Sequence, residues 1–253
     1  MQCKFTELTD YQWQFIENYF KGYQPRKHCL RNIMNAILWI TRTGSQWRNL
    51  ESRYPKWQSV YYYFRQWKIK GTLDKVLKKL VEIERIRLDR NLHPSAGAVD
   101  SQSVKIVAFT HEETGIDGGK KVNGRKRHIL VDTLGLPIAI HVSAADISDA
   151  VGGYDLLHQA EHLEGKLKLI RADQAYADMF REAASWYGFE VEVTKRPNSQ
   201  KGFVPQLGRW QVERSFSWMN FYRRLARDYE RLPASAVAFI QLMFINIILA
   251  RLA

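Results

Sequence analysis

The sequence predicts an α/β protein, with a mixed five-stranded sheet and flanking helices, preceded by a helical domain of the helix-turn-helix type. In the first part of the chain, apolar residues recur every three or four positions, which is the period of amphipathic helices. After Pro94, short segments of alternating apolar and polar residues predict strands, and helices and strands then follow one another. We therefore expect a helical domain at residues 1–92 and an α/β domain at residues 93–253.

The helices of the first domain are predicted from the signals at their ends. Thr9 and Gln12 have the spacing of a capping box, and Gly44 and Gly71 stand where two later helices should end. The expected helices cover about residues 9–20, 30–43, 46–50, 57–70 and 72–83. Their alternation with short breaks is typical of helix-turn-helix domains.

The first 90 residues hold 18 Lys and Arg against 8 Asp and Glu, and so carry most of the net charge of +12. Such a basic excess favours a polyanionic partner, above all nucleic acid, although a ribosome or a membrane surface would favour a similar composition. The apolar side of the helix over 57–70 is expected to face the core: Trp57, Val60, Tyr61, Phe64 and Trp67. The outward side holds the candidates for DNA contact: Gln58, Ser59, Tyr62, Arg65 and Gln66. The alternative is an ordinary helical domain whose outward charges only keep it soluble.

Five strands are expected in the second domain, at about residues 97–109, 125–133, 136–144, 166–173 and 189–196. The first three should form an antiparallel meander, in which a tight turn at Leu134 and Gly135 joins the second strand to the third. Helices capped by Asp149 and Asp178 should separate the remaining strands. The result is a mixed sheet with helices packed on it.

Two aspartates of this domain are candidate metal ligands. Asp100 lies within the first strand, where aspartate is disfavoured, and Asp173 follows the fourth strand, where sites of open α/β sheets are found. If these strands are neighbours, the two carboxylates meet, and a divalent cation would relieve their repulsion. Each aspartate alone could equally be a turn residue or a helix cap.

The segment from Arg209 to Leu232 reads as one amphipathic helix with a single carboxylate, Glu213, on its polar side. Arginines flank this carboxylate, which suits a metal-bound phosphodiester whose negative charge must be stabilised. The alternative is an exposed ion pair of Glu213 with Arg209 or Arg214.

A basic segment at residues 120–128 is expected to be a loop between strands. It either grips phosphates near the acids or is a solvated run of charge, and the sequence leaves both open. Its cations are Lys120, Lys121, Arg125, Lys126 and Arg127.

Three further features are interpreted more simply. His158 and His162 fit an inverted zinc-peptidase pattern, but no downstream acidic ligand is evident. Cys3 and Cys29 have no metal-ligand spacing and no signal peptide is evident, so a reducing cytoplasm is expected. The apolar tail from Pro233 is expected to be a buried helix or a subunit contact rather than a membrane span.

Four motifs in order resemble those of bacterial insertion-sequence transposases of the DDE type, close to the insertion-sequence-five family. They are VDSQSVK, GKKVNGRKRHILVDTLGLP, IRADQAY and RWQVERSFSWMNFYRRLARDYER, and LTDYQWQFIENYF and GSQWRNLESRYPKWQSVYYYF resemble the N-terminal region of that family. The resemblance implies a ribonuclease H-like fold and a catalytic, metal-binding triad of Asp100, Asp173 and Glu213. The triad would hold two Mg²⁺ ions, for which Mn²⁺ would substitute.

Two positions depart from the related Y-x2-R-x3-E-x6-K signature. Arg209 and Glu213 fit it, whereas Gln206 replaces its tyrosine and Asn220 its lysine. Arg223 and Arg224 are the nearest residues that could contact terminal DNA in place of the lysine, together with Arg209.

The resemblance implies a transposase that binds terminal inverted repeats in double-stranded DNA, cuts the element ends with Mg²⁺ and joins them to target DNA. Because two ends must be joined, a homodimer or larger assembly on DNA is expected, in the bacterial cytoplasm at the nucleoid and with no membrane partner. Two alternatives are a sequence-specific DNA-binding repressor with an inactive nuclease-like domain, and a junction-resolving or repair nuclease on the same fold.

Overall fold

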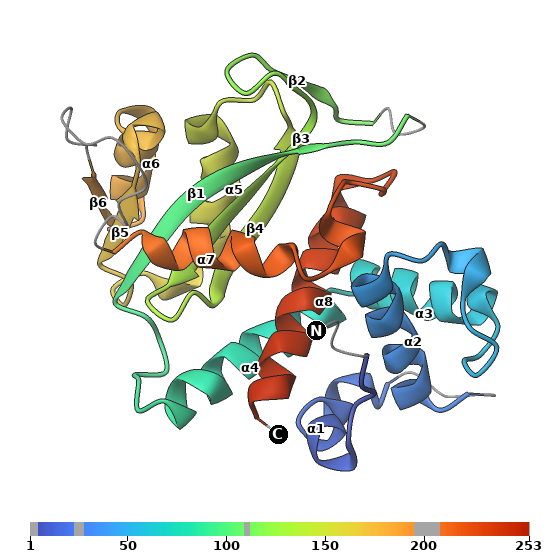
Figure 1. Cartoon of the computed structure of the whole chain (residues 1–253). Helices are drawn as coiled ribbons and strands as arrows, with labels where there is room; N and C mark the ends of the chain where they lie inside the picture. The colour runs from blue at the N-terminus through green and yellow to red at the C-terminus, as the bar shows by residue number, and fades with distance from the viewer. Residues whose placement is uncertain (1–4, 23–27, 109–111, 195–207, 253) are drawn as a thin grey trace. The chain divides into compact units, whose positions relative to one another are not determined.

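The computed structural model describes residues 5–22, 28–108, 112–194 and 208–252 (Figure 1). The chain forms two compact units. The first unit consists of Met1–Glu84, Met219–Ala226 and Ala238–Ala253, and the second of Arg85–Trp218 and Arg227–Val237. The domains expected at 1–92 and 93–253 differ from these units, because two C-terminal segments pack with the N-terminal helices.

The first unit is helical. It contains α1 (Asp10–Gln14), η1 (Glu17–Phe20), α2 (Leu30–Thr43), η2 (Trp47–Asn49), α3 (Trp57–Ile69), most of α4 (Thr72–Arg87), η5 (Arg223–Leu225) and most of α8 (Pro233–Arg251). Thr9 and Gln12 form the expected capping box. Gly44 ends α2 in the left-handed conformation, at φ 72°, and its N–H donates to the carbonyl of Ile40.

The core of the first unit includes the apolar part of α8. Phe239 of α8 stacks on Phe64 of α3, with ring centroids 5.0 Å apart, and also contacts Trp47. Within the described residues, α8 is the one helix long and apolar enough to cross a membrane, and 61% of its apolar window is buried inside the protein. This burial is what a core helix shows.

The second unit is built on a six-stranded mixed sheet. Its strands are β1 (Ala96–Lys105), β2 (Gly115–Asp117), β3 (Val122–Asp132), β4 (Pro137–Ala144), β5 (Leu169–Ala172) and β6 (Glu190–Val193). The order is β2-β3-β1-β5-β6, and β4 also pairs with β3. The meander of β1, β3 and β4 is antiparallel, as expected, whereas β1, β5 and β6 run parallel. The five expected strands are present, and β2 was missed because three residues are too few to show alternation.

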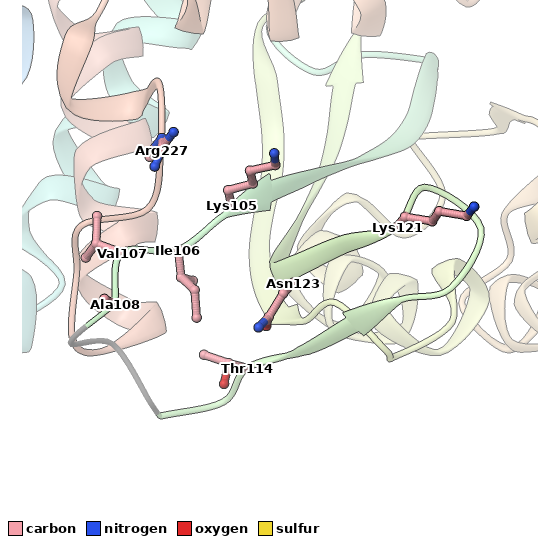
Figure 2. A pocket seen from close by; sticks show the side chains of 8 residues that line it. All are labelled: Lys105, Ile106, Val107, Ala108, Thr114, Lys121, Asn123 and Arg227. Atoms are coloured by element: carbon pink, nitrogen blue, oxygen red, sulfur yellow. The ribbon is translucent and has the colours of Figure 1, made fainter.

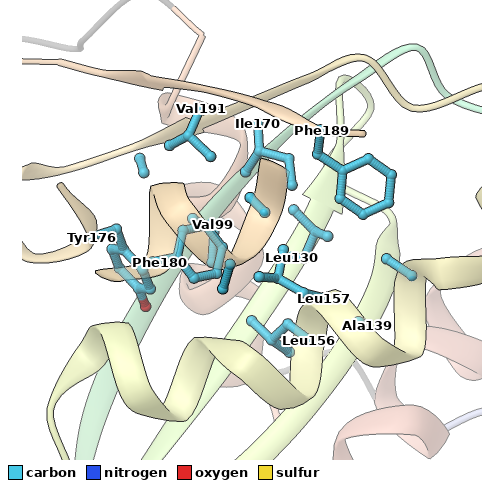
Figure 3. Close-up of a cluster of buried hydrophobic side chains, with 14 of the residues drawn as sticks. Val99, Leu130, Ala139, Leu156, Leu157, Ile170, Tyr176, Phe180, Phe189 and Val191 are labelled. Carbon is cyan, nitrogen blue, oxygen red and sulfur yellow. The ribbon is translucent and has the colours of Figure 1, made fainter. Parts of the chain in front are cut away.

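The core of the second unit lies between the sheet and the helices α5 (Asp149–Ala160) and α6 (Met179–Trp186) (Figure 3). Val99 of β1, Leu130 of β3, Leu156 and Leu157 of α5, and Phe180 of α6 are fully buried there. This packing fixes the orientation of β1 and β5, which carry the two candidate aspartates. The short helices η3 (Glu161–Leu163) and η4 (Gln174–Tyr176) follow α5 and β5.

The prediction of one long helix from Arg209 to Leu232 was wrong. Helix α7 covers only Trp210–Met219. Further on, Asp228 leaves helical geometry: its N–H donates to the carbonyl of Lys105 (2.9 Å), and its carbonyl accepts from Val107 (3.2 Å). Its carboxylate also pairs with the buried Arg125 (3.1 Å). These long-range bonds hold the chain extended beside the end of β1 and override its helical periodicity.

Candidate active site

The parallel pairing of β1 and β5 brings the two candidate aspartates to the same site. Ala98 of β1 lies opposite Arg171 of β5, so Asp100 and Asp173 each stand two residues beyond this pair. Asp100 is still within its strand, whereas Asp173 follows the end of β5 and caps η4, accepting the N–H of Ala175 at 2.9 Å. The expectation that these strands are neighbours is therefore confirmed.

Arg209 lies between the two carboxylates. Its Nη2 is 3.4 Å from Oδ2 of Asp100 and 3.8 Å from Oδ2 of Asp173. Gly208, immediately before it, has φ +83°, and a Cβ atom there would come 2.3 Å from the side chain of Arg171. Glycine thus permits both the turn into α7 and the close passage past β5. In this structure the guanidinium supplies the positive charge at the site.

The electrostatics of the site show a shortage of positive charge. Burial, with a smaller contribution from the negative charge of Asp173, raises the pKa of Asp100 to about 6. Arg209 and the N–H of Ser101, which donates to Asp100 at 2.7 Å, act in the opposite direction but do not cancel the effect of burial. One arginine therefore compensates two carboxylates incompletely.

The floor of the site contains Tyr176, which is fully buried. The hydroxyl of Ser101 lies beside that of Tyr176. The pKa of Tyr176 is raised well above its usual value, first by burial and then by the negative charge of Asp100. The tyrosine therefore stays neutral and can donate a hydrogen bond. Sequence analysis missed this residue, although it stands three positions after Asp173 in the quoted IRADQAY motif.

Glu213, the third expected ligand, lies one helical turn after Arg209 on α7 and is half-buried. No ion pair joins its carboxylate to any described residue. Arg209 points instead to the aspartates, and Arg214 donates to the carbonyl of Leu134 at 2.7 Å. The alternative of an ion pair with these arginines therefore has no support. Among the described residues, no three His, Cys, Asp or Glu side chains form a group that could hold a metal ion.

The donor set fits a divalent metal in part. Asp100 and Asp173 offer the hard oxygen atoms that Mg²⁺ prefers, and the raised pKa of Asp100 shows that a further cation would be favourable. The side chains of Asp100 and Asp173 converge on one guanidinium nitrogen, so they can also converge on a metal.

The candidate DNA contacts on α3 lie on its outer side. Gln58, Tyr62 and Arg65 are exposed, and Ser59 and Gln66 are half-buried. The expected core residues Val60, Phe64 and Trp67 are buried, but Tyr61 is 42% exposed, so the apolar side of α3 is narrower than expected.

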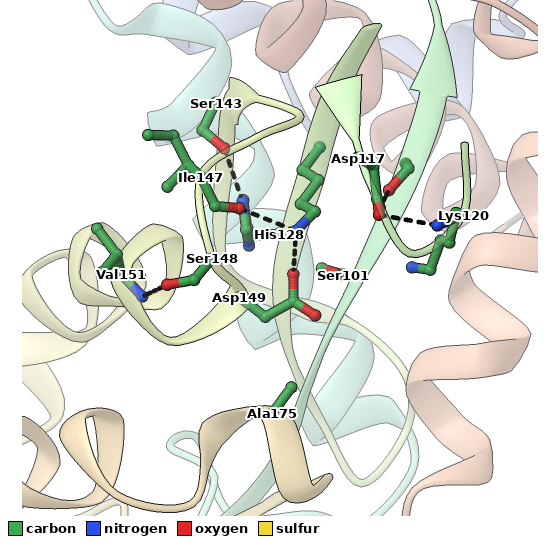
Figure 4. A network of polar contacts seen from close by, with 12 residues as sticks. Ser101, Asp117, Lys120, His128, Ser143, Ile147, Ser148, Asp149, Val151 and Ala175 are labelled. Atoms are coloured by element: carbon green, nitrogen blue, oxygen red, sulfur yellow. Dashed lines mark hydrogen bonds and ion pairs between the residues drawn. The ribbon is translucent and has the colours of Figure 1, made fainter. Parts of the chain in front are cut away.

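The basic segment at 120–128 is not a loop, since β3 begins at Val122. Lys120 and Lys121 are exposed, whereas Arg125, Lys126 and Arg127 are buried in the sheet. Lys126 pairs with Asp149 at 2.9 Å and donates to the carbonyl of Ile147. These two partners, Asp149 and Ile147, are labelled in Figure 4. The three buried cations were therefore assigned wrongly to phosphate contact. They lie in a central strand that is buried on both faces, and they have partners inside the protein.

Arg209, Arg223 and Arg224, which could contact DNA in place of the signature lysine, differ in their exposure to solvent. Arg223 is exposed, but Arg224 is 8% exposed, stacks over Phe239 with its Cζ 5.0 Å from the ring centroid, and donates to the carbonyl of Ser45. Arg209 is also buried against the acids. Of the three, only Arg223 presents an open side chain, and Gln206 lies outside the described residues.

The zinc-peptidase pattern is not supported by the structure. His158 ends α5 and is exposed beside Glu161, while His162 lies in η3 and contacts the carbonyl of Gln159. The two histidines belong to helices of different pitch, and the described part of the chain offers them no third ligand. Cys29 is an exposed free thiol, and Cys3 lies outside the described residues.

Comparisons with known proteins show which families the chain resembles. Residues 8–77 match a family described as a putative transposase of the IS4/5 family, and residues 91–249 match the transposase DDE domain. A putative transposase for insertion sequence element IS402 from Burkholderia cepacia is 28% identical over 127 residues, which are 47% of this chain and 60% of that protein. The uncharacterized protein y4sN from Sinorhizobium fredii is 28% identical over 92 residues, 34% of this chain and 74% of that protein.

The chain thus spans about three fifths of the length of the IS402 relative. The DDE match, by contrast, covers more than half of the present chain and contains all three expected ligands. A ribonuclease H-like arrangement of the mixed sheet is consistent with that match. The chain belongs to the family described as the transposase DDE domain.

Proposed function

We propose that the chain is an insertion-sequence transposase that binds the terminal inverted repeats of its element, cuts DNA at the element ends and joins them to target DNA. The observation that carries the proposal is the convergence of Asp100 and Asp173 with Arg209 inside the region that matches the DDE domain. Cleavage of a DNA strand requires stabilisation of the negative charge on the phosphodiester. The two carboxylates could hold cations for this purpose, and the guanidinium of Arg209 is itself a cation.

Asp100, Asp173 and Glu213 would hold the divalent ions, preferably Mg²⁺, with Mn²⁺ as a substitute. When bound, such ions lower the pKa of the attacking hydroxyl or water and stabilise the leaving oxygen. Burial of Asp100 and its hydrogen bond from Ser101 fix the direction of its carboxylate before any ion arrives. Preorganisation of this kind reduces the reorganisation needed during reaction.

We further propose that Arg209 binds a phosphate oxygen of the DNA. A guanidinium binds carboxylates and phosphates with the same planar set of donors. When the acids are neutralised by another cation, Arg209 becomes available to hold a phosphate oxygen next to them. Tyr176 keeps its proton because of its raised pKa and can donate to an oxygen of the same site.

Recognition of DNA is assigned to the N-terminal residues. Their excess of Lys and Arg favours phosphate binding, and the exposed side of α3 presents Gln58, Tyr62 and Arg65 to a groove. Two element ends must be held at once for joining, so we expect a homodimer or larger assembly on DNA.

Cleavage of a duplex that carries an element end, with Mg²⁺, tests the proposal. Wild type should nick the end and transfer it, and Asp100→Asn, Asp173→Asn and Glu213→Gln should each abolish both steps while leaving end binding within about twofold. Binding without any cleavage by wild type would instead favour a repressor. Cleavage governed by branched DNA shape rather than by terminal sequence would favour a junction nuclease.

A further inference from the structure

A second basic site lies in the same unit, away from the acids. A pocket of about 720 Å³ opens where the end of β1 meets the β2–β3 hairpin and the segment around Arg227 (Figure 2). Its polar lining consists of Lys105, Thr114, Lys121, Asn123 and Arg227. All of these side chains can donate hydrogen bonds, and none of the described residues that line the pocket is acidic.

The three cations of this pocket are not neutralised within the protein. Lys105, Lys121 and Arg227 are exposed, and none of them forms an ion pair with a described residue. Cations gathered around one cavity repel one another, and an anion placed between them would relieve this repulsion. Most other basic side chains of the same sheet, such as Lys126, have acidic partners.

The walls of the pocket are held by the buried Arg125. Its guanidinium donates to the carbonyls of Glu112 (2.5 Å) and Glu113 (3.3 Å), directly before Thr114. It also pairs with Asp228 (3.1 Å), directly after Arg227, and donates to the carbonyl of Glu230 (2.8 Å). One buried side chain therefore ties together two walls that are more than a hundred residues apart in sequence.

Two further contacts fix the cations themselves. The carbonyl of Lys105 accepts from the N–H of Asp228 at 2.9 Å. This bond holds the end of β1 to the segment that carries Arg227. In the β2–β3 turn, Asp117 accepts from the N–H of Lys120 at 3.0 Å and also contacts Ser103, so the position of Lys121 is set from β1. The pocket is thus built on the rigid sheet rather than on an independent loop.

We propose that this pocket binds a phosphate group of the DNA backbone. Arg227 can hold two phosphate oxygens in bidentate fashion, the lysines add charge, and Asn123 and Thr114 add neutral donors. The inference rests on the proposed function, since it takes DNA as the ligand. Lys105 stands five residues after Asp100 on β1, which places their backbones about 17 Å apart.

The test compares two triple variants of the full chain. Lys105→Gln, Lys121→Gln and Arg227→Gln together remove the charge of the pocket. Lys166→Gln, Lys168→Gln and Arg181→Gln remove equal charge from exposed positions of the same unit and serve as the matched control. Affinity for a fluorescent duplex with an element end is measured by anisotropy over a series of salt concentrations.

The pocket triple should bind about tenfold more weakly than wild type, and the slope of log K against log salt should fall in magnitude by about one, as for one lost phosphate contact. The control triple should lose less than about threefold. Arg227→Gln alone should weaken binding, and Arg227→Lys should recover part of it. Circular dichroism and melting curves check that the variants fold. If the pocket triple does not fold, the two single Arg227 variants test the proposal in its place.

Equal losses in the two triples would overturn the phosphate site while leaving the proposed function intact. If the pocket triple loses binding of inorganic phosphate but keeps duplex affinity, the pocket serves a free anion and the assignment to DNA is overturned. A wild-type protein that binds no duplex at low salt would overturn both proposals.

Discussion

Arg209 illustrates how one cationic side chain can interact with two carboxylates. It lies within reach of both Asp100 and Asp173, yet burial still raises the pKa of Asp100 to about 6. Near neutral pH the ionised carboxylate therefore destabilises the folded state, and this cost grows as the pH rises from about 4 to about 6. Removing that charge, or binding a second cation, should stabilise the protein.

We expect Mg²⁺ at saturating concentration to raise the melting temperature of wild type by a few degrees at pH 7.5, since a ligand that binds only the folded state stabilises it. Asp100→Asn should melt higher than wild type without metal and should lose most of the response to Mg²⁺. Differential scanning fluorimetry at constant ionic strength measures both effects. A His158→Ala, His162→Ala double variant is the control and should respond like wild type. An undiminished response in Asp100→Asn would refute the assignment of this ligand.

His128 is a second residue whose ionisation is coupled to the fold. Its ring is fully buried, contacts Ser143 at 2.9 Å and lies against Gly152, where a Cβ atom would come within 2.3 Å of it. Burial lowers its pKa to about 3, and the neighbouring His141 lowers it further, while Asp149 acts in the opposite direction. The imidazole is therefore neutral in the folded protein.

Because the unfolded chain takes up this proton at a higher pH than the folded one, stability should fall as the pH drops below about 6.5 toward 3. Between pH 6.5 and pH 5 the loss from His128 is about 2 kcal/mol. His128→Gln should remove that part of the pH dependence, as measured by urea unfolding at each pH. The exposed His158→Gln is the matched control and should keep the dependence of wild type. A pH dependence unchanged in His128→Gln would contradict this account.

At the scale of elements, the segment around Asp228 depends on one buried ion pair. Arg125 and Asp228 are 0% and 1% exposed in their side chains. Removal of either partner leaves a buried charge without compensation, which typically costs about 3–5 kcal/mol. The same pair also holds the walls of the basic pocket.

We therefore expect Arg125→Met to lower the free energy of unfolding by about 3–5 kcal/mol. Adding Asp228→Asn should recover part of this loss, because the uncompensated carboxylate is then removed. Urea unfolding of the single and double variants measures the difference, and Lys166→Met, at an exposed site, should change stability by less than about 0.5 kcal/mol. If the double variant is less stable than Arg125→Met by the full effect of Asp228→Asn alone, the two side chains do not act as a pair.

At the scale of the whole molecule, the two units differ from the two halves of the sequence. The first unit contains residues 219–226 and 238–253 as well as the N-terminal helices. Phe239, Ile240 and Met243 of α8 are fully buried in it. A fragment ending at residue 90 would expose the surfaces that these residues cover, so DNA recognition is better tested in the full chain.

In the full chain, Arg65→Ala should weaken binding to a duplex with an element end about three- to tenfold and reduce the salt dependence by about one phosphate contact. Lys75→Ala removes an exposed charge from α4 of the same unit and is the matched control. Anisotropy on specific and scrambled duplexes separates base reading from phosphate binding. Equal effects of the two variants would move recognition away from α3.

The amino-acid sequence by itself determined the features that depend on near neighbours in the chain. The capping box at Thr9 and Gln12, the end of α2 at Gly44 and the alternating strands all follow from local backbone preferences and periodicity. The resemblance of its motifs also identified Asp100 and Asp173 as a pair before any strand order was known. The sequence around each aspartate was sufficient for this, because each motif contains the strand or the strand end on which its aspartate lies.

Only the tertiary structure decided what depends on distant residues. Sequence periodicity extended α7 past Met219, but pairing of Asp228 with Lys105 and Arg125 holds that segment extended. Charge alone assigned Arg125, Lys126 and Arg127 to DNA, yet their position in a central strand buries them. The physical reason is the same in each case: long-range hydrogen bonds and ion pairs in the low-dielectric interior outweigh helix propensity and solvation, and neither can be read from a single segment.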